Sequence, residues 1–165
     1  SLKFSLENYS NYIHKPTKDN TFKMSLAANL AGKAISIAKT NAPHALSYPF
    51  STLYSVSHGH AVSLTINQFM VLGYLNSEKS TAPFDLRKRF YEIFKTLKVK
   101  NIYEFDLLLK NLKRAGSLEG DYHKLGINMS QDYGKIMSGV NAQRLNNFPI
   151  KISKKDVKSI LLTDE

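Results

Sequence analysis

Histidine is the residue type in this chain whose spacing could support metal binding. Three of the five histidines, His44, His58 and His60, lie between positions 44 and 60. Imidazole is a common ligand of zinc, iron and nickel, and a catalytic divalent site has about three protein ligands plus an open position. The spacing therefore indicates either part of a metal site or histidines in structural roles, and spacing alone does not decide between them.

Two consecutive helices must position His44 and His58. Asn41 is a good N-cap and Pro43 suits a first helical turn, so a helix is predicted to begin near His44. Pro49 is expected to kink or shorten this helix. A turn at 55–57 then leads into a second helix, from His58 to about residue 76. Both histidines would stand in first turns, where a short connection can bring them within reach of one ion.

The remaining pattern is also helical, and strand signals are scarce. Asn101 with Glu104 and Ser153 with Asp156 resemble capping boxes that open two of these helices. The Ala-rich segment 21–40 predicts a central, buried helix. The chain is therefore predicted to be a single all-α domain over residues 1–165, a bundle of about seven to nine helices. The further predicted segments are 2–13, 21–40, 84–97, 101–114, 130–140 and 153–162.

Composition excludes several classes of protein. The absence of cysteine excludes a disulfide framework, a thiolate nucleophile and a Cys-type zinc site, and it fits a cytoplasmic protein. No apolar run approaches the roughly 18 to 20 residues of a membrane span, and no signal peptide is visible. No Gly-rich phosphate-binding motif occurs, so nothing in the chain predicts a dinucleotide site. The chain begins without Met, and we expect an upstream region.

The formal charge of +10 has two interpretations. Lys and Arg are spread over several segments, which is typical of a solvated surface. The alternative is a non-catalytic helical module whose basic face binds nucleic acid or an acidic partner. No RNA-binding aromatic motif, zinc finger or basic zipper accompanies the charge, so nucleic-acid binding is not the favoured interpretation.

Three strings resemble the signature of the iron-containing alcohol dehydrogenases: Ala31–Ile35, Lys39–Tyr48 and His58–Val62. That family shows a His-Ala-x-x-His-Pro-x-Gly block and, some ten residues later, a Pro-His-Gly block. Its two metal-binding histidines fall at His44 and His58. The segments 24–32 and 147–149 are also similar to the family.

The resemblance implies a dehydroquinate synthase-like C-terminal helical domain, part of a larger two-domain dehydrogenase whose N-terminal nucleotide-binding domain is absent here. Members of the family hold a divalent metal, Fe²⁺ or Zn²⁺, with one Asp and three His. The metal acts as a Lewis acid while hydride passes to or from NAD(P). The implied partners are a small alcohol or aldehyde and the missing domain. A homodimer, the choice of metal and the choice of NADH or NADPH stay open.

This chain departs from the family pattern in ways that matter for the site. The Asp and the first His ligand of the family lie before Ser1, so the metal site is incomplete and the isolated chain should be inactive. Tyr48 stands where the family has the second histidine of its first block. Its phenol would either contact substrate or relay a proton, or else simply pack beside the site, since a pKa of about 10 makes it a poor base.

The variant motif looks most like the branch that includes phosphonoacetaldehyde reductases, which reduce a small anionic aldehyde. Lys39 and Thr40 precede the His44 helix and would contact the anion. The alternative for Lys39 is a cation at a helix C-terminus, facing the helix dipole. His60 would line the substrate cleft or cap its own helix.

Overall fold

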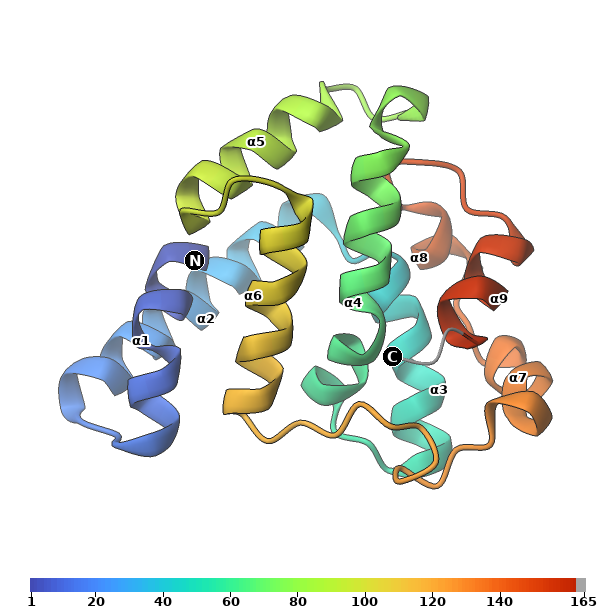
Figure 1. Ribbon diagram of the computed structural model, residues 1–165, viewed down its shortest axis with the longest axis horizontal. Helices are drawn as coiled ribbons and strands as arrows, with labels where there is room; N and C mark the ends of the chain where they lie inside the picture. The colour runs from blue at the N-terminus through green and yellow to red at the C-terminus, as the bar shows by residue number, and fades with distance from the viewer. Residues whose placement is uncertain (163–165) are drawn as a thin grey trace. The chain divides into compact units, whose positions relative to one another are not determined.

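The computed structural model describes residues 1–162, and Figure 1 shows that this part of the chain is built from helices. Nine α-helices and one 3₁₀ turn occur in it, and the only β-pairing there is an isolated bridge between Ser80 and Ile150. The prediction of an all-α fold is therefore confirmed. The helices are α1 (Leu2–His14), α2 (Lys18–Ala38), α3 (Ala42–Tyr54), α4 (His58–Leu75), α5 (Leu86–Leu97), α6 (Ile102–Ala115), α7 (Met129–Ser138), α8 (Ala142–Asn146) and α9 (Lys154–Leu162), and the 3₁₀ turn η1 spans Ser77–Lys79.

The chain divides into two compact units. The first comprises residues 1–39 and 88–117, with α1, α2, most of α5 and α6. The second comprises residues 40–87 and the chain from 118 onward, with α3, α4, η1, α7, α8 and α9. Both predicted metal-binding histidines lie in the second unit.

In the first unit, α1 and α2 pack against each other and are joined by a short turn (Figure 1). A reciprocal cap starts α2: the Asn20 backbone N–H donates to Thr17 Oγ1 at 3.3 Å, and the Thr17 N–H donates to Asn20 Oδ1 at 2.7 Å. This cap satisfies two of the backbone donors that a helix N-terminus leaves free. The helix consequently begins at Lys18, three residues before the predicted start at Thr21.

The prediction that this Ala-rich helix is central and buried is wrong. Only Asn20 and Ala27 of α2 are buried, while Phe22 is 67% exposed and Ile37 84% exposed. Alanine has the highest intrinsic helix propensity of any residue, so an Ala-rich segment forms a helix whether or not it is covered. Small residues in this segment indicated helix formation and not burial.

The other half of the first unit holds an aromatic cluster. Phe90 and Phe94 of α5 lie with ring centroids 6.0 Å apart, and Phe94 lies 6.0 Å from Phe105 of α6. All three are buried. The backbone N–H groups of Tyr103 and Glu104 donate to the Asn101 side chain, which confirms the predicted N-terminus of α6.

In the second unit, α3 and α4 pack against each other and supply most of the core. Leu46, Phe50 and Phe69 are fully buried. Phe50 stacks on Tyr122 at 5.7 Å between centroids, and Phe69 contacts Phe148 at 5.5 Å. Helix α3 also packs against α7 and α8, and α9 packs against α4 and α7. The two helices that carry the histidines therefore form the centre of the packing in this unit.

Helix α3 continues through Pro49 to Tyr54, so the proline does not shorten it. Ser55 ends the helix in the left-handed conformation, with φ of 56°. The last helix, α9, begins with the predicted capping box, in which the Ser153 N–H donates to Asp156 Oδ2 and the Asp156 N–H donates to Ser153 Oγ. Helix α8 was not predicted. Its start is capped by Asn141, whose Oδ1 accepts from the Arg144 N–H at 2.9 Å.

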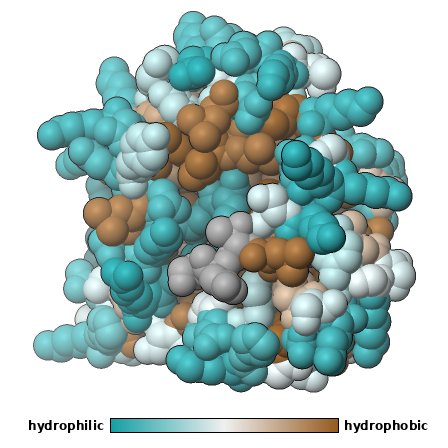
Figure 2. Space-filling view, turned by 45° about the vertical axis from the view of Figure 1, so that its right-hand side comes forward, coloured by the Kyte–Doolittle hydropathy of each residue, from teal (hydrophilic) through white to brown (hydrophobic). Residues whose placement is uncertain are grey.

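None of the described helices combines the length and the apolar content that crossing a bilayer requires. On the face shown in Figure 2, hydrophilic side chains surround smaller areas of apolar surface.

Candidate metal site

The structure brings the imidazoles of His44 and His58 together. His44 is the third residue of α3 and His58 is the first residue of α4. The two ring centroids lie 5.4 Å apart, with the ring planes inclined by 57°. His44 is half-buried and His58 is exposed. The two rings therefore face a common region that solvent reaches.

This separation suits two ligands of one ion. Imidazole nitrogens bind zinc at 2.0–2.1 Å, so two imidazoles on one tetrahedral ion have ring centroids about 5 Å apart. Among the described residues, no third His, Cys, Asp or Glu joins the pair. The pair thus fits half of a four-ligand divalent site, and the described residues supply no further ligand of these types.

Ser47 orients the ring of His58. Its side chain is fully buried, and its hydroxyl donates to the carbonyl of His44 at 2.8 Å. Ser47 Oγ also lies 3.3 Å from His58 Nδ1. A serine hydroxyl has one proton, and when that proton is directed at the His44 carbonyl, Oγ accepts from the His58 ring. In this arrangement the proton of a neutral His58 ring is on Nδ1, and its Nε2 keeps the lone pair that a metal ligand needs.

The surroundings of His44 favour the neutral form of its imidazole. Burial is the largest cause that lowers the pKa of its imidazole from the ordinary 6.5, and electrostatic interactions with the His58 ring and the Arg144 guanidinium lower it further. A neutral imidazole is the form that coordinates metal. The surroundings of His44 therefore favour coordination near neutral pH.

Tyr48 and Arg144 complete the cluster. Tyr48 lies one helical turn after His44, and its ring centroid is 5.6 Å from that of His58. Arg144 belongs to α8, and its guanidinium carbon lies 4.6 Å from the centre of the Tyr48 ring. A phenol, a guanidinium and two imidazoles thus meet where α3, α4 and α8 come together.

The residues expected to contact substrate lie in different surroundings. Lys39 belongs to the first unit, where its ammonium donates to the carbonyl of Ser36 at the end of α2, as a cation at a helix C-terminus does. The Thr40 carbonyl accepts from the Asn147 side chain at 3.0 Å. His60 Nε2 lies 2.7 Å from the carbonyl of Glu119, to which it donates. Contacts of Lys39, Thr40 and His60 with substrate stay predictions.

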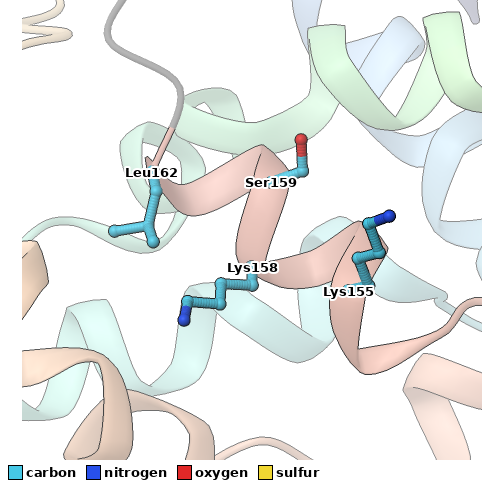
Figure 3. Close-up of a pocket in the computed structure, with 4 residues that line it drawn as sticks. All are labelled: Lys155, Lys158, Ser159 and Leu162. Atoms are coloured by element: carbon cyan, nitrogen blue, oxygen red, sulfur yellow. The ribbon is translucent and has the colours of Figure 1, made fainter.

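A separate pocket on the surface of α9 has a different lining. Figure 3 shows Lys155, Lys158, Ser159 and Leu162 around it. It has no imidazole or carboxylate among these residues, and it shares no residue with the histidine cluster. Its lining offers no metal ligand set.

Ser47 and Arg144 are the two members of the cluster that the sequence did not single out. Ser47 could have been found from its place three residues after His44, on the same face of the predicted helix. Arg144 lies about 100 residues further along the chain on a five-residue helix. Local pattern does not show that such a residue returns to the start of α3.

Comparison with known proteins agrees with this geometry. Residues 1–164 match the Fe-containing alcohol dehydrogenase family, C-terminal, and the chain belongs to that family. The members are oxidoreductases, and the family implies a metal and NAD(P). A stretch of 44 residues, 27% of this chain, is 39% identical to a phosphonoacetaldehyde reductase of Streptomyces viridochromogenes. The matched stretch spans only 11% of the length of that reductase.

Proposed function

We propose that this chain is the metal- and substrate-binding domain of an NAD(P)-dependent alcohol dehydrogenase that interconverts small aldehydes and alcohols. The favoured substrate class is a small anionic aldehyde, such as phosphonoacetaldehyde. The observation that carries the proposal is the 5.4 Å separation of the His44 and His58 rings in a member of this family. The anionic substrate is supported by the similarity to the reductase named above and by Arg144 beside the histidines.

Each residue of the cluster has a role that follows from its contacts. His44 and His58 would hold the divalent metal, Fe²⁺ or Zn²⁺, and Ser47 holds His58 in the tautomer with Nε2 free. The phenol of Tyr48 would donate a hydrogen bond to the substrate oxygen. When bound, the metal polarises the aldehyde or alcohol oxygen and NAD(P) carries the hydride.

The test compares metal binding and aldehyde-dependent NAD(P)H oxidation in the full-length protein and its variants. His44→Gln and His58→Gln should each weaken Zn²⁺ and Fe²⁺ binding, measured by chelator competition, by at least about 100-fold, more than loss of an outer-shell partner costs. His123→Gln is the matched control, because His123 lies in the 117–128 loop and makes no contact with the cluster among the described interactions. Equal metal affinity in all three variants would contradict the proposal.

Metal binding and turnover are also proposed to need residues outside this chain. The 165 residues alone should bind metal weakly and show no NAD(P)H-linked turnover, because in this family the other ligands and the nucleotide site are expected outside them. Turnover by these residues alone would contradict the proposal that the nucleotide site lies outside this chain.

A further inference from the structure

Arg144 is a cation near His44 and Tyr48, and the described part of the chain offers it no acidic partner. Its guanidinium carbon lies 4.6 Å from the centre of the Tyr48 ring, and its charge is one of the causes that lower the pKa of His44. Within residues 1–162, no carboxylate lies within ion-pair distance of Arg144. A half-buried charge without a partner is unfavourable unless an anion satisfies it.

Another arginine of the same unit provides the comparison. Arg87 also stacks on a tyrosine, with its guanidinium carbon 4.5 Å from the centre of the Tyr74 ring. Its Nε donates to Ser77 Oγ at 2.7 Å, and a second nitrogen lies 3.7 Å from a carboxylate oxygen of Glu78. The same stacking geometry thus occurs twice, but only Arg87 has its charge and donors satisfied by neighbouring side chains.

The position of Arg144 is fixed by its backbone. Asn141 caps the first turn of α8, and Asn147 at its end donates to the carbonyl of Thr40, immediately before α3. Helix α8 packs along α3, the helix that carries His44 and Tyr48. The guanidinium lies over the Tyr48 ring, and no side-chain hydrogen bond of Arg144 occurs among the described residues, so its N–H groups stay available. These N–H groups match the oxygens of a carboxylate, phosphate or phosphonate.

We propose that Arg144 binds the anionic group of the substrate, a phosphonate or phosphate, while the carbonyl end of the same molecule lies at His44 and His58. This inference rests on the proposed function. Arg144 binds the anion with the fork of its guanidinium and is thereby the residue that determines specificity for charged aldehydes. Neutral aldehydes of equal length would use the same histidines without this contact.

Two measurements on the full-length protein test the assignment. The first is binding of methylphosphonate, followed by ³¹P NMR at fixed ionic strength without added metal. Arg144→Gln should weaken this binding at least about tenfold, since a charge-assisted hydrogen bond to a charged group contributes about 1.5–3 kcal/mol. Arg144→Lys keeps the charge but loses the planar fork, so it should weaken methylphosphonate binding by an intermediate factor. This second variant keeps the test decisive if Arg144→Gln does not fold. Arg87→Gln is the matched control and should leave methylphosphonate binding unchanged.

The second measurement compares kinetics with two substrates. In Arg144→Gln, KM should rise at least about tenfold for phosphonoacetaldehyde and stay within about twofold for propionaldehyde, with kcat little changed. Equal methylphosphonate binding in wild type and Arg144→Gln, or an equal rise in KM for both aldehydes, would overturn the assignment. Failure of the wild-type protein to oxidise NAD(P)H with either aldehyde would instead count against the proposed function, and the NMR result would still decide the role of Arg144.

Discussion

The hydroxyl of Ser47 lies 3.3 Å from Nδ1 of His58, while its own proton goes to the carbonyl of His44 at 2.8 Å. One buried oxygen therefore connects the main chain at the first histidine with the ring of the second. This connection fixes which nitrogen of His58 faces outward, and it lets the proposed metal ligand be tested without removing either imidazole.

Replacing Ser47 by Ala should weaken divalent metal binding by the full-length protein about 10- to 100-fold, the usual cost of losing an outer-shell partner. Without Oγ, the ring of His58 can rotate and its tautomer is no longer selected. Chelator competition with Zn²⁺ measures the effect. Ser51→Ala is the control, because Ser51 lies one turn later on α3 and its buried hydroxyl has no hydrogen-bond partner. If both variants bind Zn²⁺ as wild type does, Ser47 does not orient a ligand.

Tyr48→Phe should lower kcat/KM for aldehyde reduction by about tenfold or more and leave the thermal unfolding midpoint nearly unchanged. The variant keeps the ring that contacts His58 and Arg144, and it removes only the hydroxyl proposed to bind the substrate oxygen. Loss of one such hydrogen bond costs about 1 kcal/mol or more. Tyr48→Leu, which also removes the ring, should lower both activity and stability. Wild-type kcat/KM in Tyr48→Phe would show that the phenol only packs.

The imidazole of His44 should titrate below 6.5 in the metal-free protein, as NMR can measure directly. Burial is the largest cause, followed by the charges of His58 and Arg144, so Arg144→Gln should raise the pKa of His44 toward 6.5. A folded-state pKa below the unfolded value means that the unfolded chain takes up the proton first as pH falls. This group therefore costs no stability above pH 6.5 and destabilises the fold progressively below it. A His44 pKa at or above 6.5 would contradict the described burial.

Two glycines, Gly134 in the middle of α7 and Gly139 at its C-cap, should respond oppositely to alanine. A Cβ at Gly134 would meet nothing within 4 Å, so Gly134→Ala should raise the free energy of unfolding by about 0.5–1 kcal/mol through helix propensity. A Cβ at Gly139 would lie 3.2 Å from Cβ of Pro49, which a helix holds on both sides and which cannot yield easily. Gly139→Ala should therefore lower stability. Urea unfolding of the two variants measures both signs, and equal shifts would contradict the packing of α7 on α3.

Local signals predicted most of the helices, because caps and apolar spacing act within a few residues. The caps at Asn101 and Ser153 and the two helix starts before the histidines are examples. The burial of α2 was mispredicted, because an Ala-rich face forms a helix equally well when it is exposed.

The candidate site was predictable only in part. The proximity of His44 and His58 follows from two adjacent helices with a short turn. Arg144 belongs to the same cluster because α8 packs against α3, and the hydrogen bond from Asn147 to Thr40 joins residues 107 positions apart. Pairings over such a separation depend on how the whole unit packs, and no local pattern shows them.

The connection at residues 55–57 has a consequence for how this family member can vary. Ser55 turns the chain in the left-handed region, Val56 is buried at 6% exposure, and Ser57 precedes His58 directly. Adding or deleting one residue here would swing the first side chain of α4 by about 100° around its axis. The number of residues in this connection, more than their chemical type, sets whether the two imidazoles meet. Substitutions are tolerable at its exposed positions, whereas changes of length are not.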